Sequence, residues 1–188
     1  MNNLDRKEIP DNTKKSFFDM ITYQMVVKSD EWLNKVKKNK STDLEVDQAL
    51  REEFDQLFNG QSLKNKISIE EYLERIQKVE LLNGIVFQIA SYLFFRIISI
   101  PGLFKNFKES NYAIKLFGTC IYTAQKFHLD IQFSPHDIGK LVGLKTRSLN
   151  QKEIFIVAKL LKFDIKITKE QIIEFRKKMF QIYFFCSN

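Results

Sequence analysis

The most constraining segment of the chain runs from Gly84 to Ile100, where apolar side chains occupy nearly every face of a helix. The segment contains Arg96 and ends at Pro101-Gly102. It is too short for a membrane span, which needs about 20 residues and rarely holds a charge. A helix that is apolar nearly all round is instead buried among other helices. The segment therefore predicts the central helix of a packed helical domain.

Signals for the starts of helices recur along the rest of the chain. In a capping box, Ser or Thr is followed three residues later by Glu or Gln, and the two side chains satisfy unpaired main-chain amides. Such boxes begin at Thr42, Ser68, Ser148 and Thr168. Ser134 is a further start, with Pro135 at the first helical position. With the apolar spacing that follows, they predict helices over approximately 14–38, 43–58, 69–80, 85–100, 112–127, 135–142, 149–161 and 169–184.

The fold class predicted from this pattern is all-α. Residues 59–66 are polar except for Leu63 and form the best linker in the chain. We therefore expect an N-terminal helical extension over residues 1–62 and a second unit over residues 63–188. Five helices are predicted between Ile67 and Leu161, and two of them are apolar on most sides. A five-helix globule, in which outer helices surround central ones, accounts for that property.

The composition argues against catalysis and against a metal site. The chain has 2 His and 2 Cys, and their spacing matches no zinc site. We expect no catalytic residue, no metal and no cofactor, and hence a protein that is not an enzyme. The two isolated cysteines and an N-terminus without an apolar signal segment favour an intracellular location, in the cytoplasm or the nucleus.

The net charge of +7 raises the question of a nucleic-acid partner. Lys far outnumbers Arg among the 30 basic residues. Basic faces that bind nucleic acid commonly include Arg, whose planar group recognises phosphate in a bidentate manner. Dispersed surface lysines are therefore the preferred interpretation, and a patch for nucleic acid or an acidic partner remains the alternative.

The stretch from Lys126 to Glu153 resembles the end of the third helix, the fourth helix and the start of the fifth helix of the cyclin box. The nearest pattern is that of the short single-box cyclins of the phosphate-response type, also called P- or U-type. That pattern runs roughly A-A-K-F-x-D-D, A-K-V-G-G-I and L-N-x-L-E. The matching residues are Ala124 to Phe127 with Asp130, then Gly139 to Leu144, then Leu149-Asn150 with Glu153. Ile67 to Ile76 is similar to the first-helix pattern, and Leu160 to Ile165 is similar to L-L-x-F-D-L.

The resemblance implies a five-helix cyclin box with an N-terminal helical extension and a C-terminal helix. A cyclin binds the kinase helix whose glutamate pairs with the nucleotide-positioning lysine, and so favours the active kinase. The resemblance implies that Lys126 and Glu153 hydrogen-bond the kinase near that helix, flanked by Phe127 and Val157. From the residues alone, an alternative stays open: Lys126 and Glu153 pair with each other, and the two apolar residues pack in the core.

Several departures from the family pattern bear on this function. Phe95 stands where the family has Asp, so that Arg75 would lack its usual internal carboxylate. Leu129 replaces an acidic residue, and the segment from Glu153 to Phe163 is one residue longer, which would rotate the end of the helix by about 100°. The lost Asp at position 95, the inserted residue and the altered opening of the third helix at Tyr112 to Lys115 favour a second hypothesis, a cyclin-fold scaffold subunit of a larger assembly without kinase activation. A basic nucleic-acid-binding module is the third hypothesis, less favoured because such cyclin-like factors generally carry two boxes.

Overall fold

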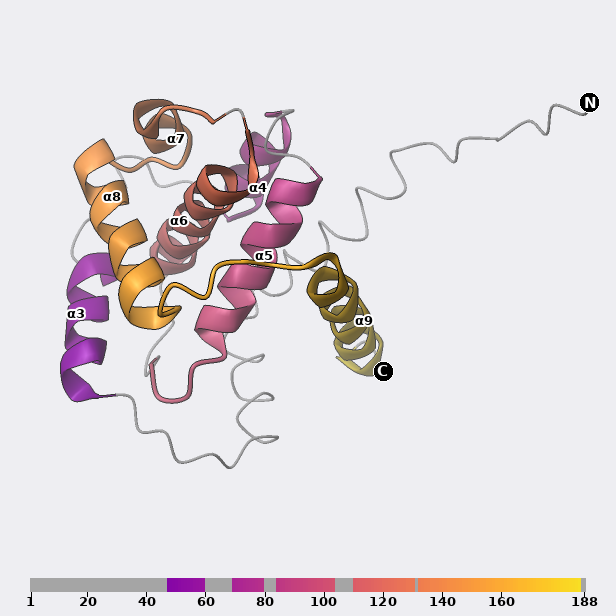
Figure 1. Ribbon diagram of the computed structural model, residues 1–188. Helices are drawn as coiled ribbons and strands as arrows, with labels where there is room; N and C mark the ends of the chain where they lie inside the picture. Colours follow the sequence, from indigo (N-terminus) through magenta and orange to yellow (C-terminus); the bar gives the residue numbers. More distant parts are fainter. Residues whose placement is uncertain (1–46, 60–68, 80–83, 104–109, 131, 187–188) are drawn as a thin grey trace, which may run out of the picture.

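The computed structural model describes residues 47–59, 69–79, 84–103, 110–130 and 132–186, and these segments form helices joined by loops without any strand (Figure 1). The all-α prediction is therefore confirmed. The predicted helix over 14–38, the starts at Thr42 and Ser68, and the boundary between residues 62 and 63 lie outside the described residues. The elements are α3 (Gln48–Asn59), α4 (Ile69–Gln77), α5 (Ile85–Ile98), α6 (Ser110–His128), α7 (Pro135–Leu141), α8 (Thr146–Ile154), the π-helical η2 (Phe155–Leu160) and α9 (Lys169–Cys186).

Helix α5 is the central helix that its sequence predicts. Most of its residues are buried, and it lies side by side with α6 (Figure 1). Phe117 of α6 meets two rings of α5 in edge-to-face geometry, at centroid distances of 5.4 Å to Phe87 and 5.7 Å to Phe94. Such contacts stabilise an aromatic core beyond the burial of its area. The pair α5–α6 is thus the frame on which α3, α4, α8 and α9 pack.

Helix α3, which falls in the predicted N-terminal extension, packs on α6 and α8. Phe54 and Phe58 stack at 4.6 Å and lie 5.2 and 5.9 Å from the ring of Tyr112 on α6. Phe54 also approaches Phe155 of η2 at 6.0 Å. The exposed ion pair between Glu53 and Lys159 of η2, at 3.0 Å, adds a surface contact. Helix α3 therefore shares the hydrophobic core of the helices that follow it.

Helix α9 covers α5 at the position where the family pattern is broken. The ring of Phe95 lies 5.5 Å from Phe175 of α9, and the ammonium of Lys178 lies 5.1 Å from the Phe95 centroid. The Phe95 ring is thus held by an aromatic contact and a cation–π contact from α9. The ion pair found for Arg75 within the described residues is a surface pair with Glu71 of its own helix, at 3.8 Å.

Two of the predicted helix starts are confirmed. The hydroxyl of Ser134 accepts a hydrogen bond from the amide of Asp137, at 3.2 Å. Thr168 and Gln171 form a complete capping box: the Thr168 amide donates to the Gln171 side chain at 2.8 Å, and the Gln171 amide donates to the Thr168 hydroxyl at 3.3 Å.

The predicted start at Ser148 is wrong. Helix α8 begins earlier, at Thr146, after Lys145 in an extended conformation. Ser148 lies inside the helix, and its hydroxyl accepts a hydrogen bond from the ammonium of Lys152 at 2.7 Å. A local capping pattern was therefore overridden by a buried contact one turn further on.

The helix predicted over 149–161 continues from α8 into the π-helical η2. The amide of Leu161 donates to the carbonyl of Ile156, five residues earlier, at 2.8 Å. A π turn holds one more residue than an α turn, so it can absorb an inserted residue. The expected rotation of about 100° assumed α geometry throughout, and that assumption is wrong for this segment.

Candidate partner-docking site

The two charged residues predicted for the site lie together at the rim between α6 and α8. The ammonium nitrogen of Lys126 lies 3.0 Å and 3.2 Å from the two carboxylate oxygens of Glu153. The Glu153 side chain is only 5% exposed, whereas that of Lys126 is 41% exposed. The pair is therefore anchored in the protein on its acidic side and open to the surface on its basic side.

Aromatic rings lie on two sides of the Lys126 ammonium. The centroid of Phe127 is 5.6 Å away and that of Tyr122 is 5.7 Å away, distances at which a ring attracts a cation. Phe127 is 44% exposed, so this predicted site residue lies at the surface. Val157, the other predicted flanking residue, is buried. Of the two, only Phe127 offers its side chain to a partner.

Tyr122 and Asn150 belong to the same polar group, and the sequence analysis missed both in this role. The Tyr122 hydroxyl donates to the side-chain oxygen of Asn150 at 3.2 Å. Burial raises the pKa of Tyr122, Lys126 opposes this rise and Glu153 adds to it, so the hydroxyl keeps its proton near neutral pH. Tyr122 precedes Lys126 by four residues, the spacing at which two side chains share a helix face. That spacing is the signal that could have identified it.

The end of α6 that carries Lys126 is fixed by the loop before α7. The buried side-chain amide of Gln125 accepts from the main-chain amide of Phe133 at 2.8 Å and donates to its carbonyl at 3.2 Å. Gln132 donates to the main-chain carbonyl of Lys126 at 2.8 Å. These contacts hold the backbone of Lys126 in place, so that its ammonium is presented from a rigid support.

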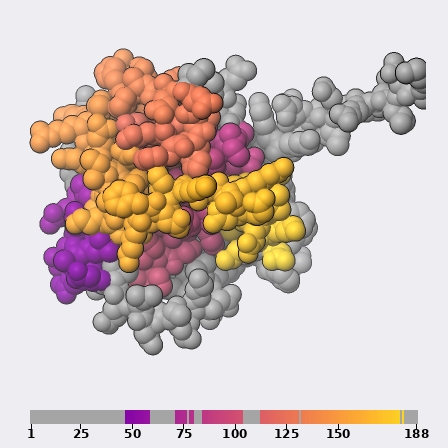
Figure 2. Space-filling model, in the orientation of Figure 1, coloured from indigo at the N-terminus to yellow at the C-terminus, as the bar shows by residue number. Residues whose placement is uncertain are grey.

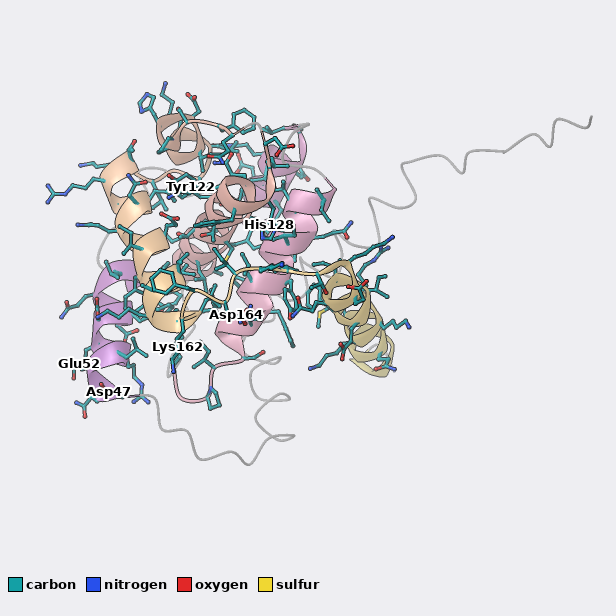
Figure 3. All side chains as sticks on the ribbon, viewed as in Figure 1. Asp47, Glu52, Tyr122, His128, Lys162 and Asp164 are labelled. Carbon is teal, nitrogen blue, oxygen red and sulfur yellow. The ribbon has the colours of Figure 1, made fainter. Side chains whose placement is uncertain are left out.

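The connector, which we define as residues 161–168, joins η2 to α9 and passes across α5 and α6 (Figure 1). Arg96 of α5 donates to both the carbonyl and the carboxylate of Asp164, each at 2.7 Å. His128 of α6 lies 3.1 Å from the carbonyl oxygen of Ile165. Figure 3 shows Tyr122 and His128 on α6, with Lys162 and Asp164 on the connector. In the space-filling view, the golden atoms of η2 and the connector lie between α3 and α9 (Figure 2).

Phe163 is the most exposed large apolar residue in the described part of the chain, at 73%. Its amide donates to the carbonyl of Val157 at 2.8 Å, so it lies beside the helix that carries Glu153. Phe163 matches the family pattern, but the sequence alone does not assign it to the site. Its exposure depends on the turn after η2, which the apolar spacing does not reveal.

The described residues offer little for chemistry. Among them no group of three His, Cys, Asp or Glu side chains could hold a metal ion. Burial raises the pKa of the Cys120 thiol far above its usual range, so this cysteine is not a thiolate nucleophile at neutral pH. No helix of the described segments is long and apolar enough to cross a bilayer.

The described helices thus form an all-α domain with a partly exposed polar group, Lys126 with Glu153, at its rim. The family model described as Cyclin matches residues 19–165, which is most of the chain, so the protein belongs to the cyclin family. This confirms the family predicted from the sequence and supports a cyclin-like regulatory role. The match includes α3 and extends into the connector, and α9 lies beyond it. No curated protein and no solved structure matches the chain.

Proposed function

We propose that this protein binds and activates a cyclin-dependent kinase, and that Lys126 and Glu153 form the polar centre of its docking surface. The pairing of these side chains across α6 and α8, at 3.0 Å, carries the proposal. An ammonium has three donors, and the 41% exposure of Lys126 leaves part of it facing outward. Lys126 can therefore donate to a main-chain carbonyl of the kinase while it remains paired with Glu153. Hydrogen bonds from a charged donor are about twice as strong as neutral ones.

The apolar surroundings of the pair supply the rest of the proposed interface. Phe127 and Phe163 are both exposed large apolar residues, and their burial against a kinase helix would stabilise the complex. The charged pair would fix the orientation of that helix. Because the kinase glutamate on this helix must meet the nucleotide-positioning lysine, a cyclin that binds the aligned helix better shifts the kinase toward its active state.

The stretch 126–153 is similar in sequence to the single-box cyclins of the phosphate-response type. This similarity supports membership of that narrower class. In this proposal residues 63–188 form the cyclin box with its C-terminal helix, and residues 1–62 form the N-terminal extension. The proposal implies an intracellular protein, in the cytoplasm or the nucleus, which acts through its kinase and is not itself an enzyme.

A second candidate function is a cyclin-fold scaffold subunit that does not activate a kinase. Both carboxylate oxygens of Glu153 are already bound by Lys126, and the side chain is 5% exposed. Such a closed pair could simply join α6 to α8. The packing of Phe95 against α9, where the family has a carboxylate, also suits a box with altered partners.

The test uses the purified full chain and a panel of purified cyclin-dependent kinases. Affinity is measured by calorimetry, and activation is measured as phosphate transfer to a peptide. We expect the wild type to bind and stimulate at least one kinase. The double variant Lys126→Ala with Glu153→Ala should bind that kinase at least about tenfold more weakly, as expected for central interface residues.

The matched control is the double variant Lys159→Ala with Glu53→Ala. It removes an ion pair of the same 3.0 Å length that joins η2 to α3, and it should bind the kinase within about twofold of the wild type. If the wild type binds one or more kinases but stimulates none of them, the scaffold function would be favoured. Full binding by the Lys126/Glu153 variant would overturn the site, and failure of the wild type to bind any kinase would overturn the proposed function.

A further inference from the structure

Directly after its first residue, the connector has two consecutive residues in a conformation that side chains rarely adopt. Lys162 has φ 50° and Phe163 has φ 62°, and neither is glycine. Left-handed backbone in such residues costs free energy and persists only where neighbouring contacts enforce it. Phe163 is 73% exposed, so burial of its ring does not offset this cost.

The contacts that enforce this backbone come from both flanks. On the η2 side, the amide of Phe163 donates to the Val157 carbonyl and that of Asp164 donates to the Leu161 carbonyl, each at 2.8 Å. On the other side, Arg96 binds Asp164 through two hydrogen bonds of 2.7 Å. The guanidinium of Arg96 is in turn 5.9 Å from the centroid of Tyr92. Arg96 is thus held on the central helix α5, and its side chain binds Asp164, the residue directly after the strained pair.

We propose that Arg96 is a positioning residue for partner docking: by binding Asp164, it holds Phe163 exposed after the helical segment that carries Glu153, where the ring inserts between apolar side chains of the kinase. This inference rests on the proposed function. Phe163 is tied to the helical segment that carries Glu153, because Val157 lies one turn after Glu153 and its main-chain carbonyl accepts the hydrogen bond from the Phe163 amide. The connector is also held on α6, because His128, which lies two residues after Lys126, contacts the carbonyl oxygen of Ile165.

A purely structural role for Arg96 predicts a different outcome. If the Arg96–Asp164 pair only stabilises the fold of the connector, its loss should lower thermal stability. Kinase binding should then weaken only as far as the folded fraction of the protein falls. If it positions Phe163, its loss should weaken binding while the fold stays intact, because a 67% exposed Asp164 contributes little to the core. The pair also differs from Glu53–Lys159, which no strained residue adjoins.

The experiment compares four variants of the full chain for binding to the kinase that the wild type binds. Phe163→Ser should weaken binding at least about tenfold with an unchanged melting temperature. Arg96→Gln should have a similar effect and should speed hydrogen exchange of the amides of residues 163–165. The double variant Arg96→Gln with Lys162→Gly should recover at least half of the change in log Kd caused by Arg96→Gln, because glycine adopts positive φ without the steric cost. Lys159→Gln should bind within about twofold of the wild type.

Asp164→Asn replaces Arg96→Gln if that variant does not fold, because it removes the charge and keeps the main-chain carbonyl that Arg96 binds. Wild-type affinity in Phe163→Ser or in Arg96→Gln would overturn the inference and leave the proposed function intact. Absence of rescue by Lys162→Gly would overturn the positioning role in favour of direct contact by Arg96. A wild type that binds no kinase would overturn both the inference and the proposed function.

Discussion

The ammonium of Lys115 on α6 lies 2.9 Å from the main-chain carbonyl oxygen of Phe58, in the last turn of α3. The final carbonyls of a helix lack partners within it, and a cation there is favourable. Lys152 of α8 approaches the same residue, with its ammonium 5.5 Å from the Phe58 ring centroid. Both lysines are only 2% exposed. Two buried cations therefore meet at the end of α3.

The first prediction concerns the charge of Lys152. Burial, followed by the repulsion of Lys115, lowers the pKa of Lys152 to about 8, whereas a lysine in the unfolded chain has a pKa of about 10.4. At pH 7 both states hold the proton, so the folded state bears the full cost of the buried charge. Replacing Lys152 by Met should then raise the free energy of unfolding by about 1–3 kcal/mol at pH 7.

The pH dependence supplies the check on Lys152. Above pH 8 the folded protein loses this proton while the unfolded chain keeps it, so this group makes the wild type more stable as pH rises. The advantage of Lys152→Met should shrink between pH 8 and 10 in urea denaturation. The exposed Lys159→Met should show a difference from wild type that does not vary with pH. A constant advantage of Lys152→Met from pH 7 to 10 would contradict the assignment.

The second prediction concerns the close approach of α4 to α6. A methyl group at Gly118 would lie 2.5 Å from the hydroxyl oxygen of Tyr72 and 2.8 Å from Cβ of Val142. Gly118→Ala should destabilise the protein by about 1–3 kcal/mol through overpacking, although glycine to alanine in an open helix stabilises. Thermal unfolding measures the change. Unchanged or increased stability would show that the helices can separate without cost.

Tyr72 offers the companion substitution. Its hydroxyl is buried and has no hydrogen-bond partner in the part of the chain that the structure describes. Burial, and to a lesser degree Cys120, raises the pKa of this hydroxyl well above its usual value, so it stays neutral. Tyr72→Phe should therefore be neutral or stabilising. Combined with Gly118→Ala, it should recover part of the lost stability, and strict additivity of the two effects would argue against their contact.

The third prediction concerns the Lys126–Glu153 pair in the isolated protein. Lys126→Met leaves the 5% exposed carboxylate of Glu153 without its cation. Because an unpaired, largely buried charge is costly, we expect a loss of about 1–3 kcal/mol, less than for a fully buried pair. Glu153→Gln should cost less, since Lys126 is left near solvent. The reverse order of the two effects in urea denaturation would contradict this account.

The fourth prediction concerns the strained connector. Lys162→Gly removes the steric cost of positive φ, which is about 1–3 kcal/mol for an ordinary residue. The greater freedom of glycine in the unfolded chain offsets about 0.5–1 kcal/mol of that gain. The difference is an expected net increase of about 1 kcal/mol, within a range of about 0–2.5 kcal/mol, in the free energy of unfolding measured by urea denaturation. The neighbouring Lys166→Gly, at a residue without positive φ, should instead destabilise, and equal effects would exclude strain at Lys162.

The sequence predicted best what depends on local spacing. The starts at Ser134 and Thr168 are confirmed because the side chain and the amide that it caps are three residues apart. The start at Ser148 failed because its hydroxyl is taken by Lys152, whose ammonium is held in the interior by packing. Propensity and capping are weak signals, and tertiary contacts override them.

For the candidate site too, the sequence predicted what local patterns encode and missed what depends on tertiary contacts. The resemblance selected Lys126 and Glu153, and their direct pairing at 3.0 Å was left open as an alternative. The roles of Asn150 and Phe163 escaped prediction because they depend on contacts between helices and on a π turn. A helical period of 3.6 residues cannot signal a turn with a different period. The family membership of the chain could be predicted, and the shape of its surface could not.

The packing of α3 has a consequence for synthesis of the protein on the ribosome. Phe54 and Phe58 leave the ribosome early, but Tyr112 and Phe155, against which they pack, follow much later in the chain. At about 5–20 residues per second, the stretch from Phe54 to Phe155 takes about 5–20 s to translate. During that interval the aromatic face of α3 lacks its native cover, and the nascent chain presents it to chaperones and to neighbouring chains.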